Sequence, residues 1–324
     1  MDSIMLCASS RQLRSDIFLS ICIPFYGYDV SLLLRELLEQ AGKYSNELEI
    51  ILFDDGSNYG NDYVPELLKL IRSSEISVRL YRSEKNIGRA AARNFLGGMA
   101  YGAYILFLDA DMLPDSRNYL AYYMSIIKPG QVALVVGGRS YERLDMSSIC
   151  RENRLYLYYS MASECLTAEE RQIQPERYLF TNNFVIRRDI FILYPMDNSF
   201  KGWGYEDIDW ALELNKAGIK ILHVNNTATH FGLIGTTQLL RKYESSVNNL
   251  CMLIAKNTDQ AIALPVCRYS LLLSQLNLPF QYGKRFFSSM IKTSFFPLRI
   301  RIMLLQGFKL CIYAQALKSK RKWL

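Results

Sequence analysis

Short apolar runs alternate with amphipathic stretches along the first third of the chain. The apolar runs stop at turn-forming residues, which is typical of buried strands. Strands are therefore expected at 17–23, 48–53, 76–82 and 104–110. Helical spacing of the apolar residues predicts helices at 31–42, 62–73 and 88–100. This alternation implies a parallel sheet covered by helices on both faces, with right-handed crossovers.

The second half of the chain has a less regular pattern. Strands are expected at 131–139, 179–188 and 219–224, and helices at 151–166, 206–217 and 236–256. Beyond Pro265 the chain consists of short segments rich in Leu, Phe, Lys and Arg. The pattern thus predicts an α/β body followed by a different C-terminal region.

The charge of the chain is divided unevenly. Residues 261–324 contain no Asp or Glu but eleven of the 38 Lys and Arg. Residues 1–260 contain the remaining 27 basic side chains and all 31 acidic ones, so they carry a net charge of −4. A basic tail rich in apolar residues favours an anionic membrane surface as its partner, and a helical cap on the body is the alternative. No other feature supports binding to nucleic acid.

Cysteine usage and the lack of targeting segments bear on the compartment. The seven cysteines are irregularly spaced without a CxxC pair, so reduced thiols are expected in place of disulfides or a zinc site. The sequence contains no run of 18 or more apolar residues, so it predicts no membrane-spanning helix. Its N-terminal residues do not have the pattern of a signal peptide. We therefore expect a cytoplasmic protein.

Carboxylates follow two of the expected strands. Asp109 and Asp111 are separated by one residue, so in an extended segment they point to the same side. Two carboxylates this near to each other repel unless a cation lies between them. Oxygen ligands of this kind suit Mg²⁺ or Mn²⁺. Asp54 and Asp55 precede Gly56 and could accept hydrogen bonds from a nucleoside. A solvated acidic loop and a simple turn are the respective alternatives.

A helix start with nearby arginines follows the third expected strand. Gly88 stands at the start, and Arg89 and Arg93 lie four residues apart on one face. Such a helix N-terminus can hold a diphosphate, although a solvated basic face would have the same pattern.

Together these segments resemble the family 2 glycosyltransferases with the GT-A fold, over roughly residues 17–235. The resemblance implies a mixed sheet flanked by helices. We expect a catalytic domain at 16–245, an N-terminal extension at 1–15 and, from the charge pattern, a basic amphipathic helical region at 246–324. The donor-binding residues that it implies are Pro24, Tyr26, Asp54, Asp55, Gly88, Arg89, Arg93, Asp109, Asn182 and Asn183. Asp109 and Asp111 match the DxD motif, with Asp111 as the direct ligand of the metal.

The segment GWGYEDIDW at 202–210 is similar to the GWGGEDDD segment of galactosyl- and N-acetylgalactosaminyl-transferases. By that resemblance Asp207 is the catalytic base and Glu206 contacts sugar hydroxyls. Trp203, Gly204 and Tyr205 are expected at the acceptor, although Tyr205 replaces a glycine of the pattern. A helix start alone would also favour three acids through its dipole.

The two histidines differ in context. His223 lies in an apolar strand, where a core histidine is expected. His230 lies in the loop beyond it, and in related transferases a histidine at this distance from the acid pair completes the metal site. The resemblance also implies that Asn182 and Asn183 contact the donor sugar, whereas polar residues at a strand edge would look the same.

The sequence therefore predicts a metal-dependent inverting glycosyltransferase that uses Mn²⁺ or Mg²⁺. It is expected to move a hexose or N-acetylhexosamine from a UDP-sugar to a glycan acceptor, expected to be lipid-linked, at the inner face of the plasma membrane. A sugar nucleotidyltransferase is the alternative enzyme, but the Gly-rich basic loop that it needs is missing from the N-terminal region. A non-catalytic nucleotide-sugar or carbohydrate-binding protein is the other alternative, and it would not need two acid pairs.

Overall fold

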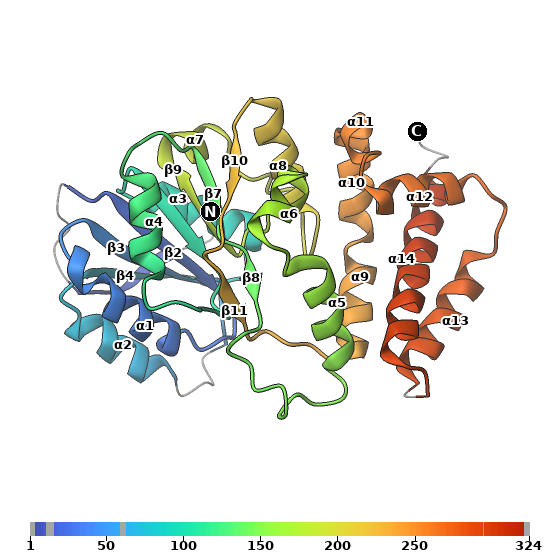
Figure 1. Ribbon diagram of the computed structural model, residues 1–324, viewed down its shortest axis with the longest axis horizontal. Coiled ribbons are helices and arrows are strands. Elements are labelled where there is room, and N and C mark those ends of the chain that lie inside the picture. Colours follow the sequence, from blue (N-terminus) through green and yellow to red (C-terminus); the bar gives the residue numbers. More distant parts are fainter. Residues whose placement is uncertain (1–3, 11–15, 59–62, 294, 321–324) are drawn as a thin grey trace. The chain divides into compact units, whose positions relative to one another are not determined.

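A computed structural model of the protein describes residues 4–10, 16–58, 63–293 and 295–320 (Figure 1). Packing divides the chain into two compact units, which are described separately. The first comprises the described parts of Met1–Leu144, Glu164–Asn198 and Glu213–Gly232, and the second comprises Asp145–Ser163, Ser199–Leu212 and the described part of Leu233–Leu324. The expected boundaries at 15/16 and 245/246 remain predictions. Residues 1–3 and 11–15 of the expected N-terminal extension lie outside the described residues.

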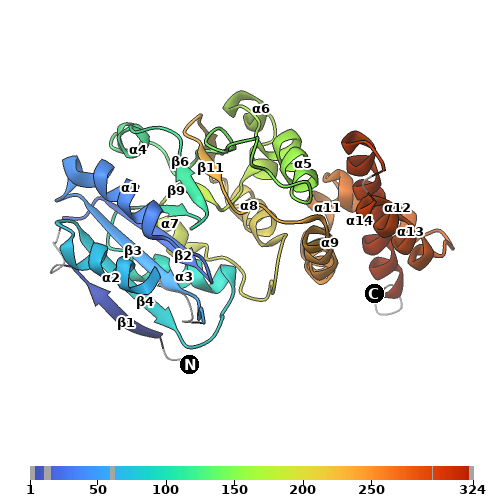
Figure 2. The ribbon, with the colours of Figure 1, turned by 90° about the horizontal axis from the view of Figure 1, so that it is seen from below.

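The first unit is built on a mixed sheet with the strand order β1-β4-β3-β2-β5-β9-β7-β10. Its strands are β1 (Ile4–Ser9), β2 (Leu19–Phe25), β3 (Leu48–Asp54), β4 (Ser77–Ser83), β5 (Tyr104–Leu108), β7 (Leu134–Val136), β9 (Asn183–Arg187) and β10 (Ile221–His223). The four strands expected from the alternation are parallel, as predicted. β9 runs antiparallel to β5 and β7. Figure 2 shows β1, which the sequence pattern did not predict, at the sheet edge beside β4, to which it is antiparallel.

Helices cover both faces of this sheet, which explains the uninterrupted apolar strands (Figure 1). The helical elements of the unit are α1 (Ser31–Ala41), η1 (Gly42–Tyr44), α2 (Tyr63–Ser73), α3 (Arg89–Met99), α4 (Tyr119–Ile127), α6 (Ala168–Gln172), η2 (Pro175–Tyr178) and α7 (Arg188–Leu193). Leu19, Ile21 and Ile23 of β2 share a core with α1, α2 and α4. On the other face, Phe107 of β5 contacts Phe191 of α7, with ring centroids 4.9 Å apart.

The first unit also contains a small three-stranded sheet, whose first strand follows β5 in the chain. It has the order β6-β11-β8, formed by β6 (Met112–Pro114), β11 (Ala228–His230) and β8 (Arg139–Ser140). The β11–β6 pairing is antiparallel and places His230 opposite Met112. This register brings His230 next to the DxD segment, although 118 positions separate it from Met112 in the sequence.

The second unit is helical. It contains most of α5 (Arg154–Glu164), the start of α8 (Glu206–Lys216), α9 (Thr236–Ser245), α10 (Val247–Lys256), α11 (Thr258–Ala261), α12 (Pro265–Ser274), α13 (Phe280–Lys292) and α14 (Leu298–Lys320). The helix expected at 236–256 is two helices that meet at Ser246, whose hydroxyl bonds to Tyr243 O and lies 2.8 Å from Tyr313 Oη. The C-terminal region is helical, as expected, but its last helix is long.

The last helix, α14, is long enough to be considered as a membrane-spanning helix. In the described part of the chain, this 23-residue helix alone is long and apolar enough to cross a membrane by length and composition. Core helices of globular proteins meet the same test, and Leu305, Phe308 and Ile312 of α14 are buried in the core of the second unit.

Candidate active site

Asp111 and His230 form the centre of the candidate site in the first unit. Asp111 follows β5, and its Oδ2 lies 3.2 Å from His230 Nε2 at the end of β11. Burial would raise the pKa of the Asp111 carboxyl, but the His230 imidazole and two nearby arginines lower it to about 2. The Asp111 side chain keeps 28% of its surface exposed and is therefore accessible. A carboxylate and an imidazole so arranged fit Mn²⁺ better than Mg²⁺.

Two further residues at this site had no recognised sequence signal. Tyr141 is buried, and its Oη lies 3.4 Å from His230 Nδ1, so it helps to orient the ring. At Gly232, an added Cβ would lie 2.0 Å from Asp111 Oδ2 and 2.9 Å from His230 Nε2. Only a glycine therefore fits here without moving the pair.

Asp109 is directed towards a buried arginine, and its roles in donor and metal binding stay predictions. Its carboxylate is ion-paired with Arg93, whose side chain is only 2% exposed. Arg93 is thus a buried partner of the DxD segment, and its expected contact with the donor stays a prediction. Among the described residues no group of three or more His, Cys, Asp or Glu side chains is arranged to hold a metal ion. The remaining ligands of a cation at Asp111 and His230 would have to come from a substrate or from solvent.

Asp54 and Asp55 shape the loops at the end of β3. Asp55 accepts hydrogen bonds from the backbone N–H groups of Ile87 and Gly88, at 2.6 and 3.1 Å. Asp54 accepts one from Ser57 N at 2.8 Å, and both acids are buried. At Gly56, an added Cβ would lie 2.6 Å from Lys85 C, so this glycine permits the approach of another loop. Contacts of the two acids with uridine stay a prediction.

The other expected donor-side residues are more accessible. Gly88 is the N-cap of α3 and has a φ of 94°, which favours glycine. Arg89, the first residue of α3, is exposed, and its positive charge helps to lower the pKa of Asp111. Pro24 is half-buried in β2, and Tyr26 directly beyond that strand is 58% exposed. These positions agree with a diphosphate site beside Asp111, which stays a prediction.

Asn182 and Asn183 have different roles. Asn183 Oδ1 accepts hydrogen bonds from Tyr119 and Tyr123, and its Nδ2 donates to Gly138 O and Asn226 O. All four bonds of this amide are used inside the core, and its contact with the donor sugar stays a prediction. The buried Nδ2 of Asn182, in contrast, has no hydrogen-bond partner in the described structure. Asn182 is thus the better candidate for a sugar contact.

His223 is the core histidine that its context predicted. Arg171 Nη1 donates to His223 Nδ1 at 2.8 Å, so Nε2–H is left to donate to Pro175 O at 3.0 Å. Burial is the main cause that lowers the pKa of His223 to about 4, and Arg171 adds to it.

The three acids of GWGYEDIDW lie in the first turn of α8, in the second unit. Asp209 is buried and accepts hydrogen bonds from Lys256 Nζ at 2.8 Å and Asn257 Nδ2 at 2.7 Å, so it is structural. Glu206 is also buried, whereas Asp207 is half-exposed. Of the two predicted catalytic acids, Asp207 is therefore the more accessible.

The residues before α8 are held by other helices of this unit. Asn249 Nδ2 donates to Gly204 O and Lys201 O, at 2.9 Å each. The Trp203 ring is half-buried against Tyr243, with centroids 5.2 Å apart. Tyr205 has a φ of 72°, the conformation natural to the glycine it replaces, and its ring contacts Tyr313. The structure thus gives the Tyr205 ring a packing role, and its place at the acceptor stays a prediction.

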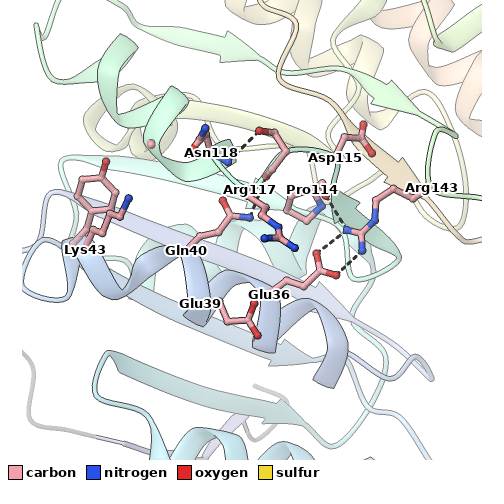
Figure 3. Close-up of a pocket in the computed structure, with 12 residues that line it drawn as sticks. Glu36, Glu39, Gln40, Lys43, Pro114, Asp115, Arg117, Asn118 and Arg143 are labelled. Atoms are coloured by element: carbon pink, nitrogen blue, oxygen red, sulfur yellow. Dashed lines mark hydrogen bonds and ion pairs between the residues drawn. The ribbon is translucent and has the colours of Figure 1, made fainter.

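A separate polar pocket of about 690 Å³ lies between α1 and the segment from β6 to α4 (Figure 3). Arg143 closes one side through two hydrogen bonds to Glu36, both 2.7 Å, and one to Pro114 O. Asp115, also at its wall, accepts hydrogen bonds from Ser140 and Thr229. The charges of Arg143, Glu36 and Asp115 are thus already paired or hydrogen-bonded within the protein. The other charged lining residues are Glu39, Lys43 and Arg117.

Comparisons with known proteins agree with this fold. The sequence profile of glycosyl transferase family 2 matches residues 20–193. An uncharacterized glycosyltransferase of Haemophilus influenzae is 36% identical over 93 residues, which are 29% of this chain and 36% of that protein. The chain thus spans about a third of the length of this curated relative.

Two solved structures are similar in fold over nearly the whole chain. A mannosyltransferase from Pyrobaculum calidifontis, PcManGT, in complex with GDP-Man and Mn²⁺, has a TM-score of 0.55 at 15% identity, covering 97% of this chain and 90% of that one. S. aureus TarS in complex with UDP has a TM-score of 0.51 at 14% identity, covering 95% and 92%.

Proposed function

Because the chain belongs to glycosyl transferase family 2, and is thus a glycosyltransferase, we propose that it transfers a hexose or N-acetylhexosamine from a UDP-sugar to a hydroxyl of a glycan acceptor. The observation that carries the proposal is the Asp111–His230 pair, held beside Gly232 at the end of β5. A divalent cation, Mn²⁺ or Mg²⁺, would supply charge neutralisation for the leaving diphosphate at this pair.

The chain's own residues would perform the remaining steps. Arg89 and the N-terminus of α3 bind the diphosphate, and Asn182 contacts the donor sugar through its unpartnered amide. Asp207 removes the proton of the acceptor hydroxyl while that oxygen attacks the anomeric carbon, and Glu206 orients sugar hydroxyls. Since no enzyme nucleophile takes part, the configuration at the anomeric carbon is inverted.

We further propose that the second unit docks on an anionic bilayer to reach a lipid-linked acceptor. Four apolar side chains of the α13–α14 hairpin are strongly exposed: Tyr282, Phe286, Phe295 and Met303, at 62, 58, 88 and 73%. Arg285 and Arg299 are also exposed on these helices. Exposed aromatic groups beside cations suit the interface of an anionic membrane. The protein would then act at the inner, cytoplasmic face of the plasma membrane.

Release of the free nucleotide from a panel of UDP-, GDP- and dTDP-sugars, with and without Mn²⁺, tests the transfer. GDP-sugars belong in the panel because PcManGT was captured with GDP-Man. We expect release from a UDP-hexose or UDP-N-acetylhexosamine that EDTA abolishes. Asp111→Asn should reduce it by about 10²-fold or more. Absence of release with every UDP-sugar, or release unaffected by EDTA, would contradict the proposal.

A further inference from the structure

The second unit contains a basic pocket that sugar transfer does not use. Its volume is about 300 Å³, and it lies where the start of α9 meets the end of α13 and the first turns of α14. Its lining residues are Arg151, Glu152, Thr236, Thr237, Lys292 and Arg301. Three of the six are cations, and Glu152 is the one acid among them.

Arg301 is a buried cation without a counter-ion. It is only 8% exposed, and it donates from Nε to Ile291 O at 2.8 Å and from Nη2 to Thr236 Oγ1 at 3.0 Å. It forms no ion pair with any residue that the structure describes. Burial lowers the pKa of Arg301, and the charge of Arg151 lowers it further. A buried charge without a partner of opposite sign is costly, so an anion in this pocket would be stabilised.

The start of α9 adds donors to the same pocket. This ten-residue helix begins after Gly235, which supplies no side-chain cap. Thr236 N is bonded to Glu152 O, but within the described residues the next two N–H groups, of Thr237 and Gln238, have no partner. Free N–H groups and the positive end of the helix dipole favour an anion here.

We propose that this pocket binds a phosphate group, carried by a phospholipid headgroup or present as a free phosphate. A guanidinium, an ammonium, a hydroxyl and helix N–H groups approach it from α14, α13 and α9. Donors from several directions match the tetrahedral oxygens of phosphate better than the two oxygens of a planar carboxylate. The inference goes beyond the proposed sugar transfer and does not depend on it.

Binding of inorganic phosphate to the full chain, measured by calorimetry, tests this site without any sugar substrate. Arg301 supports the fold, so the test variant is Arg151→Ala/Lys292→Ala, which removes two exposed cations. The matched control is Arg241→Ala/Arg268→Ala, which removes two exposed cations from α9 and α12. Parallel flotation with phosphatidylglycerol and phosphatidylcholine vesicles separates the two phosphate sources.

The test variant should lose phosphate affinity, or affinity for phosphatidylglycerol vesicles, by about tenfold or more, while the control stays within about twofold of the parent chain. A loss confined to the vesicles identifies a lipid headgroup, and a loss with inorganic phosphate identifies a free phosphate site. The proposal is overturned if the parent chain binds neither probe, or if both variants bind them equally well.

Discussion

Gly232 shows how a single residue defines the site. A Cβ added there would lie 2.0 Å from Asp111 Oδ2, so Gly232→Ala should displace one side chain of the Asp111–His230 pair. A displacement of about 1 Å at a reacting centre costs about 10²-fold in rate, and we expect a loss of that order in metal-dependent transfer. Gly98→Ala is the matched control, because a Cβ there meets no atom within 4 Å. Equal activity of the two variants would show that the pair is not positioned through Gly232.

His223 makes the stability of the protein depend on pH. Its folded pKa of about 4 lies below its ordinary value of 6.5. The unfolded chain therefore takes up the proton first, and stability should fall between about pH 6.5 and 4, and change no further on this account below pH 4. Allowing for partial solvent screening, the loss is on the order of 2 kcal/mol. Denaturant unfolding across this range should show a shallower pH dependence for His223→Gln, and an unchanged dependence would refute the assignment.

What the sequence could predict at this scale depended on motif and context. Asp111 and His230 were found by resemblance, and the structure brings them together. Asn182 and Asn183 are neighbours in one polar segment, and only the packing of Tyr119 and Tyr123 around Asn183 distinguishes them. Gly232 and Tyr141 carry no local pattern because their roles arise from contacts distant in sequence.

At the scale of elements, apolar periodicity predicted the buried strands and helices well. β3 and β5 are buried on both faces and were read correctly from their apolar runs. β1 was missed: its residues 4–8, IMLCA, are all apolar, yet the strand lies at the edge of the sheet and is largely exposed, not buried. α4 was also missed, since its nine residues, YLAYYMSII, are apolar on nearly all sides and show no helical period.

The start of α8 combines strain with packing at Tyr205. A positive φ costs a non-glycine residue about 1–2 kcal/mol, whereas removing a packed aromatic ring costs about 3–5 kcal/mol. Tyr205→Gly should therefore lower the free energy of unfolding by about 2 kcal/mol, although it relieves the backbone. Tyr205→Phe keeps the ring and should lose less. Denaturant unfolding measures both, and a stabilised glycine variant would mean that the ring contributes little.

At the scale of the whole molecule, the described basic residues of 261–324, a stretch without Asp or Glu, lie in the helical C-terminal part of the second unit. The exposed α13–α14 hairpin should bind vesicles that contain anionic lipid and not neutral ones. Tyr282→Ser/Phe286→Ser should weaken flotation by about tenfold, because each change removes apolar area from the interface. Ile173→Ser/Leu193→Ser, at exposed positions of the first unit, is the matched control. Equal flotation of both variants, or none by the parent chain, would remove the membrane proposal.

The central claim, sugar transfer with Asp207 as the base, is tested most directly by comparing Asp207→Asn with Asp209→Asn. Asp207 is half-exposed, whereas Asp209 is bonded to Lys256 and Asn257. The account predicts that Asp207→Asn lowers the transfer rate by about 10²–10⁴-fold while UDP-sugar binding and stability are kept. Asp209→Asn should lower stability by about 2–3 kcal/mol instead. Near-normal transfer by the Asp207→Asn variant would contradict the account.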